Sequence, residues 1–493
     1  MTIPAGTTLD AAGLIAQVQR HRQLGHRFAG LHASRTGADQ TLRLTALMAV
    51  PAGIVPVDAL VPAAGYPSLT AGVPAAFWYE RVIHDLFGVV PAGHPRLDPL
   101  LLPLLDRAAR PLAGDTGQSL AIEPDEHALT RQVLGTGLFT IPHGPVRSGV
   151  MESVEYLVES PGEDIPYLRV RPYYKHRGLE KRFETATPDG GVLLAERVEG
   201  IASVAHALAY CHALEALSDT AVPRAAGLVR VLHAELERVA NHVDVALRLA
   251  DAAGLAVAVA RFGWHKERVL RLVSRLCGNR FGRGVVVLGG VSAVPRLSTS
   301  ELLRELAALQ RALDPDLRLL MATSSFLDRL RRTGPLSPEL AADHGALGPV
   351  GRASGQLDDD RVSRGYDGYG SLEPRAVTGH AAGDAMARLQ VRVAEIAESF
   401  RLVRAAVERV DGTAWLRAEV SVHSGRGIGW AEAPQGEVVY TVQVEDGRIA
   451  RCAPRSASFH NLALFGSVFD GDILTDFPFI EASFGLSIAG VAA

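Results

Sequence analysis

Residues 225–249 read AAGLVRVLHAELERVANHVDVALRL. Apolar side chains recur through this stretch at i, i+3 and i+4 spacing with few helix breakers, which predicts a long amphipathic helix. Residues 196–217, ERVEGIASVAHALAYCHALEAL, repeat the pattern and predict a second helix. We therefore expect a helical core, and the side chains expected to face it are Ile201, Val204, Leu208, Leu228, Val231, Leu232, Val239 and Val243.

Segments that favour strands lie on both sides of this helical centre. Residues 440–444, YTVQV, alternate like a half-buried strand. Near the start, apolar runs at residues 42–50 and 53–61 are separated by Pro/Gly-rich breaks, as in a small domain with a few strands. A linker rich in Pro, Gly and Ala follows. The sequence predicts an α+β protein of two domains, a small α+β domain over residues 1–118 and a large, mainly α-helical domain with flanking strands over residues 136–493.

Composition narrows the function classes. The chain has 493 residues, a length that favours two globular domains. Its formal net charge of -4 gives no reason to expect a nucleic-acid partner. The start does not resemble a secretory signal, and the apolar runs fall far short of the roughly 20 residues that a membrane-spanning helix requires. We therefore expect any membrane location to come through partner subunits. Three widely spaced cysteines, Cys211, Cys277 and Cys452, favour a reducing cytoplasm and buried thiols over a disulfide framework or a CxxC metal site.

The segment WYERVIHDLFG at residues 78–88, followed by GHP, ends the small domain. Trp78 and Phe87 are expected in its core, whereas Glu80, Arg81 and Asp85 are expected on a helix surface. The segment resembles the signature of the 30 kDa subunit of complex I, WxERExxDxFGI followed by GHPxL. That resemblance implies a docking module without chemistry of its own.

Two polar motifs of the second domain can be interpreted from the physical properties of their residues. HRGLEK at residues 176–181 places a glycine after His176 and Arg177, and glycine permits a close or left-handed backbone. ELERVANH at residues 235–242 puts charges on an otherwise apolar helix, which indicates an internal polar network. A solvated helix face is the alternative, and it is favoured for Glu237.

A third polar motif, GPVGRASG at residues 348–355, is followed by Asp359 and Arg361. With Arg352, these side chains can form charge-assisted hydrogen bonds. Such bonds would either line a cavity or fix a loop without taking part in chemistry.

Two further motifs are RVEGIA at residues 197–202 and SFGLSIAG at residues 483–490. Together with the polar motifs, they resemble the large subunit of group 4 [NiFe] hydrogenases, the energy-converting, formate hydrogenlyase type, and its relative, the 49 kDa subunit of complex I. In the hydrogenases the two motifs read RxCGxC and DPCxxC, and four thiolates hold nickel and iron. The residues in those places here are Glu199, Ala202, Ser487 and Gly490. None replaces a soft thiolate, so we expect no NiFe centre and predict no metal ligand.

The resemblance extends to the end of the chain. RSASFHNL at residues 455–462 and DFPFIEAS at residues 476–483 resemble RAPSFxNL and DxPxIIxSLDP, which keeps the last motif in register. The chain also stops at Ala493, without the tail that hydrogenase maturation proteases remove after nickel is loaded. We expect both features of a subunit that loads no nickel.

The resemblance implies roles for single residues. The histidine that follows Gly-Pro in the family is Arg147 here, and His143 is either its substitute or a turn histidine with local hydrogen bonds. His143, Arg177 and Arg361 are the candidate cofactor-binding residues. Glu199 is expected to be either a proton carrier with a raised pKa or the structural partner of an arginine such as Arg197. The candidate catalytic residues, expected to line one cavity, are His176, Arg197, Glu199, Arg352 and Asp359.

The function that follows is an expectation from the family. The chain would be the large subunit of a membrane-associated oxidoreductase complex on the cytoplasmic face of the cell membrane. A partner small subunit would carry a [4Fe-4S] cluster, a quinone or similar acceptor would be reduced, and membrane subunits would translocate ions. The alternative is a non-catalytic subunit that couples other subunits mechanically. A hydrogenase that uses another metal is a weaker rival, because three scattered cysteines do not form a site.

Overall fold

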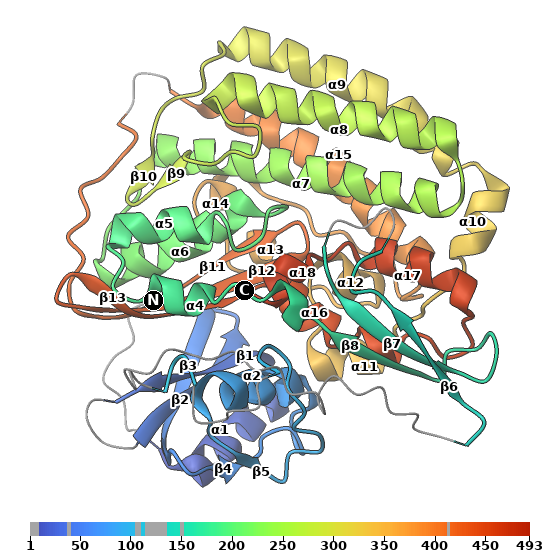
Figure 1. Ribbon diagram of the computed structural model, residues 1–493. Helices are drawn as coiled ribbons and strands as arrows, with labels where there is room; N and C mark the ends of the chain where they lie inside the picture. The colour runs from blue at the N-terminus through green and yellow to red at the C-terminus, as the bar shows by residue number, and fades with distance from the viewer. Residues whose placement is uncertain (1–8, 37–40, 104–109, 114–135, 148–151, 412–414) are drawn as a thin grey trace.

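The computed structural model describes residues 9–36, 41–103, 110–113, 136–147, 152–411 and 415–493 (Figure 1). Within these ranges the protein is α+β, as predicted, and no helix is both long and apolar enough to cross a bilayer.

The N-terminal part is a three-stranded antiparallel sheet covered by helices. Its elements are α1 (Ala11–Gln23), β1 (Arg27–Arg35), β2 (Thr41–Val50), β3 (Gly53–Pro62), β4 (Tyr66–Pro67), α2 (Phe77–Phe87) and β5 (Pro91–Ala92). The two apolar runs predicted from the sequence are β2 and β3, and they pair in register from Thr41 opposite Pro62 to Val50 opposite Gly53. Asp10 caps α1 by accepting the N–H of Gly13 at 2.8 Å.

The charged residues of α2 correct the expectation of a solvated surface. Glu80, Arg81 and Asp85 are all buried. Glu80 accepts the backbone N–H of Leu69 at 2.8 Å, and Asp85 accepts that of Leu100 at 2.8 Å. Buried loop amides need acceptors, and the helix that packs against these loops supplies them. The expectation for Trp78 and Phe87 is confirmed, since both lie in the core.

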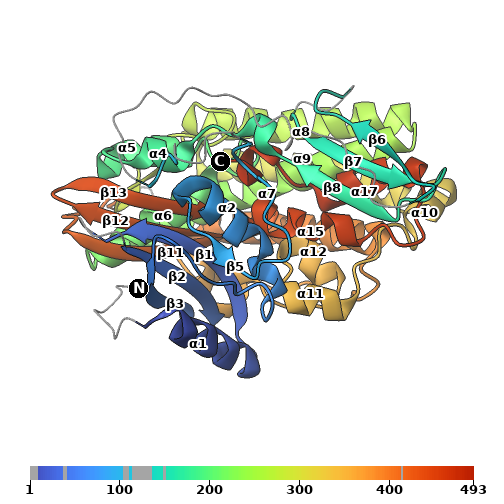
Figure 2. The same ribbon diagram turned by 60° about the horizontal axis from the view of Figure 1, so that its bottom comes forward.

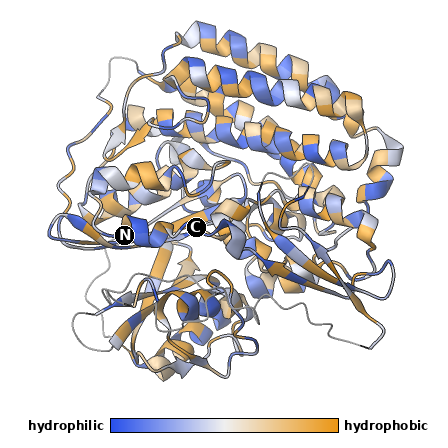
Figure 3. Cartoon of the chain, viewed as in Figure 1, coloured by the Kyte–Doolittle hydropathy of each residue, from blue (hydrophilic) through white to orange (hydrophobic). Residues whose placement is uncertain are grey.

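Helices dominate the second part of the chain. They are α4 (Leu179–Phe183), α5 (Pro188–Ala195), α6 (Ser203–Leu217), α7 (Arg224–Ala252), α8 (Ala256–Cys277), α9 (Thr299–Leu320), α10 (Ser324–Leu330), α11 (Pro338–His344), α12 (Gly348–Ala353), α13 (Asp360–Ser363), α14 (Tyr369–Leu372), α15 (Ala385–Arg409), α16 (Ala457–Leu462), α17 (Phe477–Phe484) and α18 (Ile488–Val491). Helix α7 packs against both α8 and α15, and α9 lies beside α8 at the top of Figure 1. Figure 3 shows apolar and polar residues interleaved along these helices, as amphipathic packing requires. The long predicted helix is therefore confirmed as α7.

The other predicted helix is shorter than its periodicity suggested. Helix α6 begins at Ser203, and residues 196–202 form turns that connect it to α5. Arg177 explains the difference, because its guanidinium binds the carbonyl oxygens of Arg197 and Val198 at 2.7 and 2.5 Å. A helix through this segment would use those carbonyls for its own hydrogen bonds.

Strands flank the helices on both sides, as expected. They are β6 (Phe139–His143), β7 (Glu155–Ser160), β8 (Tyr167–Arg171), β9 (Val286–Val287), β10 (Gly290–Val291), β11 (Gly425–Ala433), β12 (Gly436–Glu445) and β13 (Arg448–Arg455). The antiparallel sheet β11-β12-β13 has α6 on one face and the N-terminal sheet near the other (Figure 2). Val439 of β12 packs in one cluster with Ala29 and Leu47 of the N-terminal sheet. Strand β12 is thus buried on both faces, and the half-buried prediction for residues 440–444 was wrong.

Candidate functional site

The two motifs that lack cysteines lie against each other. Glu199 is in the turn before α6, and Gly490 is in α18. A Cβ atom added to Gly490 would lie 2.8 Å from both Cδ and Oε2 of Glu199. The carboxyl group of Glu199 therefore fills the space that a side chain at position 490 would need.

The carboxyl group of Glu199 is held by a chain of buried hydrogen bonds. Ser458, in α16, donates to Oε1 at 2.5 Å, and Oε2 lies 3.1 Å from His206 Nε2 in α6. His206 Nδ1 lies 2.9 Å from the hydroxyl of Tyr440 in β12. Burial raises the pKa of Tyr440 well above its ordinary value, so this hydroxyl keeps its proton and donates to Nδ1. His206 then presents an Nε2–H to Glu199, which gives a continuous donor chain from Tyr440 to Glu199.

The second motif is fixed by another carboxylate. Glu152 accepts the hydroxyl of Ser487 at 2.8 Å, the N–H of Ala489 at 3.2 Å and the N–H of Ile488. The N–H of Ser487 donates to the Ser458 hydroxyl at 3.1 Å. Ser458 therefore links the network of Glu199 to that of Glu152.

The HRG motif joins both loops. Besides the carbonyls of Arg197 and Val198, Arg177 binds the carbonyl of Ala489 at 2.7 Å. Gly178 has a φ of 61°, the left-handed backbone that the glycine was predicted to permit. His176 lies against the backbone of residues 492–493, and burial lowers the pKa of His176 to about 4.

Arg197 does not enter the site. Its side chain is 51% exposed, and it donates to the carbonyl of Leu193 at 2.6 Å. The expected ion pair between Arg197 and Glu199 is not formed, because Arg197 points to the surface from a turn that was predicted as helix. The described hydrogen-bond partners of Glu199 are His206 and Ser458 instead.

Arg352 and Asp359 belong to a separate buried network around α7, α12 and α15. Arg352 pairs with Glu395 at 2.7 Å, and Arg361 pairs with Asp359 at 2.7 Å and with Glu235 at 3.2 Å. Burial would raise the pKa of Asp359, but Arg361 and then Arg352 hold it at about 2. The structure therefore does not bring the five candidate catalytic residues together around one cavity, and Arg352, Asp359 and Arg361 brace the helices.

His143 lies in β6, half-buried, with its ring 5.0 Å from that of Phe477 in an edge-to-face contact. Burial lowers the pKa of His143, and the nearby charge of Arg147 lowers it further. Arg147 pairs with Glu481 at 2.6 Å and lies over the ring of Tyr156. The residue that replaces the family histidine is therefore tied to α17.

A cavity of about 90 Å³ opens between α7, α8 and the turn that follows Glu199. Gly200 and Ile201 line it, but the five candidate catalytic residues do not. Glu237 lines it too, and accepts the N–H groups of Val204 and Ala205 at 2.8 and 3.1 Å. Helix α6 has no side-chain cap of its own at Ala202, so Glu237 serves as its cap from a neighbouring helix.

Sequence reasoning missed Glu237 by placing it on a solvated face. Burial raises its pKa to about 8, aided by the negative charge of Glu199. A signal was present, because His233, Glu237, Asn241 and Asp244 follow i, i+4, i+8 and i+11 spacing and so share one face of α7. All four line the cavity.

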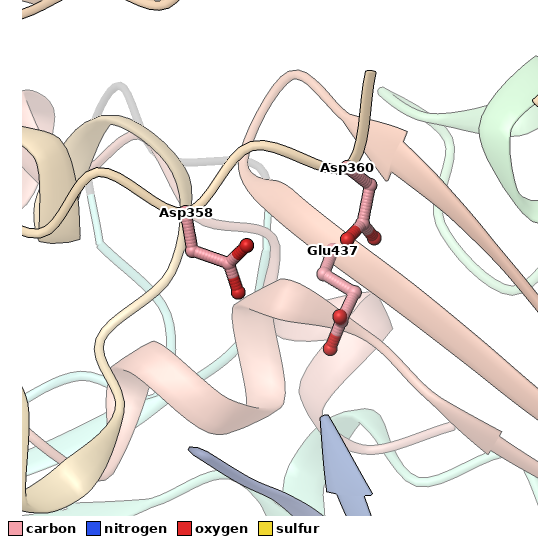
Figure 4. A group of neighbouring side chains, drawn as sticks. All are labelled: Asp358, Asp360 and Glu437. Atoms are coloured by element: carbon pink, nitrogen blue, oxygen red, sulfur yellow. The ribbon is translucent and has the colours of Figure 1, made fainter. Parts of the chain in front are cut away.

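Figure 4 shows three neighbouring carboxylates, which are Asp358 in a loop, Asp360 at the start of α13 and Glu437 in β12. Guanidinium groups already surround them. Arg27 of β1 pairs with Asp358 at 2.9 Å and with Glu437 at 2.7 Å, Arg364 pairs with Asp360 and Glu437, and Arg455 pairs with Glu437. Three arginines balance three carboxylates, so this cluster is an ion-pair network that ties the N-terminal sheet to the large domain.

The fold and the site define a class: an α+β chain in which two motif loops face each other, one through a glutamate and the other through a glycine, with no cysteine in either loop. Residues 15–116 match the family described as respiratory-chain NADH dehydrogenase, 30 Kd subunit, and residues 254–424 match that of the 49 Kd subunit. The chain belongs to the family of complex I 30 kDa and 49 kDa subunit fusions, which includes the group 4 hydrogenase large subunits. This confirms the family inferred from the motifs.

Individual relatives span both branches of the family. Formate hydrogenlyase subunit 5 of Escherichia coli is 28% identical over 87% of this chain and 77% of its own length. Hydrogenase-4 component G of the same organism is 29% identical over 85% of this chain and 74% of its own length. An NADH-quinone oxidoreductase subunit of Methylococcus capsulatus is 27% identical over 86% of this chain and 81% of its own length.

The residues at the two motif loops do not fit a nickel–iron centre. The donor set that faces the site is a carboxylate and hydroxyls, and Glu199 occupies the space beside Gly490. Burial raises the pKa of Cys211 and of Cys452 well above the ordinary value, so both stay thiols rather than thiolate ligands. No step of a mechanism is therefore assigned to such a centre.

Proposed function

We propose that this chain is the large subunit of a membrane-associated oxidoreductase complex that passes electrons to a quinone or similar acceptor without a NiFe centre. A partner small subunit would bring the electrons through a [4Fe-4S] cluster. Membrane subunits would couple the reaction to ion translocation and hold the chain on the cytoplasmic face. The names of the relatives, which are hydrogenase, formate hydrogenlyase and NADH-quinone oxidoreductase subunits, support this class.

The observation that carries the proposal is the exchange of a thiolate position for a protonatable network. Glu199 fills the space at Gly490 and continues through His206 to Tyr440. Reduction of a quinone to a hydroquinone consumes two electrons and two protons. A buried chain of carboxyl, imidazole and phenol groups can hold and move such protons, whereas it cannot bind nickel.

One observation favours the alternative, a non-catalytic coupling subunit. The network of Arg352, Arg361, Glu235 and Glu395 joins the four helices α7, α12, α13 and α15 through charge-assisted pairs. Such a network specifies a rigid arrangement and needs no substrate. In that case the motif loops would hold the architecture of the complex.

The test uses the intact complex, purified through a tag on this chain. Nickel and iron are measured by mass spectrometry, and quinone reduction is assayed with reduced viologen as electron donor. Iron without nickel, with quinone reduction, supports the proposal. Iron without nickel and no reduction favours the coupling subunit, and stoichiometric nickel refutes both.

The variant Glu199→Gln then tests whether the chain of protonatable groups from Glu199 to Tyr440 takes part in turnover. It keeps the shape of the side chain but removes the titratable group, so we expect assembly to be normal and turnover to be slowed. Glu408→Gln, on an exposed site of α15, is the matched control. Normal turnover in Glu199→Gln removes Glu199 from the mechanism.

A further inference from the structure

The cavity between α7 and α8 contains polar atoms without described partners. His233 is 2% exposed and Asn241 is 5% exposed. Within the described residues, His233 Nδ1 and the side-chain oxygen of Asn241 have no hydrogen-bond partner. Buried polar groups are almost always satisfied, so these two atoms indicate that the cavity holds hydrogen-bonding molecules.

The remaining wall of the cavity is mostly apolar, and its residues include Ile201, Val204, Leu236, Leu270, Val273 and Phe281. The volume of about 90 Å³ decides what can enter. A water molecule needs roughly 10–15 Å³ of such space together with polar partners, so the cavity has room for a short chain of waters.

The cations beside the cavity are already paired with other carboxylates. Lys266 of α8 lies 2.7 Å from Asp244, and Arg280, beyond α8, lies 2.5 Å from Glu267. Burial lowers the pKa of His233 to about 4, so its imidazole is neutral. Besides Arg238, its neighbour on α7, the charge that acts on Glu237 is the negative one of Glu199. The carboxyl group of Glu237 is therefore held by two backbone amides and by no described ion pair.

We propose that Glu237 is the proton-carrying residue that supplies the site beside Glu199, and that waters held by His233 and Asn241 reload it from solvent. This inference rests on the proposed function. When the acceptor takes two electrons from the partner cluster, it takes two protons. The carboxylic acid of Glu237 gives up one of them and becomes a carboxylate. A proton from bulk solvent then returns along the waters of the cavity and restores the acid. The restored acid gives up the second proton and is reloaded in the same way.

Glu237 suits this role by position. It belongs to the polar stripe of α7 and contacts the first turn of α6, which follows Glu199 and the cavity-lining residues Gly200 and Ile201. Its two described hydrogen-bond partners are backbone amides, which do not titrate. A change in the charge of Glu237 therefore breaks no described ion pair.

The first measurement is an infrared titration of the intact wild-type complex against the Glu237→Gln complex. A protonated carboxyl band present at pH 7 only in the wild type, and lost as the pH rises through about 8, is the expected result. Quinone reduction by the wild type should fall through the same pH range. Glu237→Gln should be at least tenfold slower and should lose this pH dependence, which a purely structural capping role would not change.

Two further variants separate proton delivery from capping. Ala240→Leu fills part of the cavity and leaves Glu237 intact, so we expect slower reduction with the carboxyl band retained. Glu408→Gln on α15 is the control and should match the wild type in rate and band.

The outcomes distinguish the two proposals. A Glu237 that is already ionised at pH 7, or a Glu237→Gln complex that turns over like the wild type, overturns the inference and leaves the proposed function standing. A wild-type complex that reduces no quinone refutes the proposed function, and with it the delivery step. An unchanged rate in Ala240→Leu overturns the role of the cavity.

Discussion

Gly490→Ala tests whether the two motif loops meet as described. The backbone at Gly490 lies outside the left-handed region, so alanine adds no backbone strain. Its Cβ would lie 2.8 Å from Cδ and Oε2 of Glu199, closer than real Cβ contacts allow. The carboxyl group must therefore move away from His206 and Ser458.

The expected cost follows from those two bonds. Hydrogen bonds to charged groups contribute roughly 1.5–3 kcal/mol each, and overpacking a well-filled site costs typically about 1–3 kcal/mol. Loosening both bonds without losing either should lower the free energy of unfolding by roughly 2–3 kcal/mol. In a Glu199→Ala background the clash disappears, so the added cost of Gly490→Ala should fall to about 0.5 kcal/mol or less.

Urea denaturation of the four chains, wild type, two single variants and the double variant, measures this coupling. Gly200→Ala is the matched control, since its Cβ would meet nothing within 4 Å although the residue adjoins Glu199. It should change stability by less than about 0.5 kcal/mol. Additive effects of Gly490→Ala and Glu199→Ala would refute the contact, and with it the argument that the carboxyl group replaces the thiolate site.

Three further results are expected. Arg352→Met leaves Glu395 buried without its closest cation and should cost about 3–5 kcal/mol in urea denaturation, whereas Arg271→Met, in an exposed pair on α8, should cost less than about 1 kcal/mol; equal costs would contradict the buried network. Because the pKa of Glu237 is raised to about 8 in the folded chain, its stabilising contribution is complete at low pH and is lost as the pH rises from about 4.5 through 8. The stability of Glu237→Gln should thus decline less over that range, by up to roughly 1.4 kcal/mol per pH unit, and parallel pH profiles would exclude the shift. Ser458→Ala removes a donor to the Glu199 carboxyl group and should lower stability by about 1–3 kcal/mol, against almost no change for the exposed Ser300→Ala, with thermal unfolding as the measurement.

Periodicity and motif spacing were enough to predict much of the fold. Helix α7 follows directly from its apolar spacing, and the β2 and β3 strands follow from apolar runs between turn residues. The start of α6 could not be predicted from its apolar spacing, because the carbonyls of residues 197 and 198 are bound by Arg177, twenty residues earlier in the chain. Likewise, the alternation of apolar and polar residues at 440–444 predicts a strand with one buried face. In the structure the N-terminal domain covers the other face of this strand.

The site was only partly predictable for the same reason. Motif comparison identified Glu199 and Gly490, but their contact joins segments from opposite ends of the large domain. Charge type alone placed Arg197 beside Glu199, yet Arg177 is the arginine that binds the loop. Glu237 was assigned to solvent because a charged residue on a helix usually lies there, and only the packing of α6 and α8 onto α7 encloses it.

Arg177 also has a mechanical consequence. Its guanidinium group donates hydrogen bonds to the carbonyls of Arg197, Val198 and Ala489. The two motif loops are therefore both bound to the segment that carries Arg177. Tyr174, three residues earlier, is 42% exposed. A protein that displaces this surface would move both loops together as one rigid unit. The distance between Glu199 and Gly490 would then stay the same.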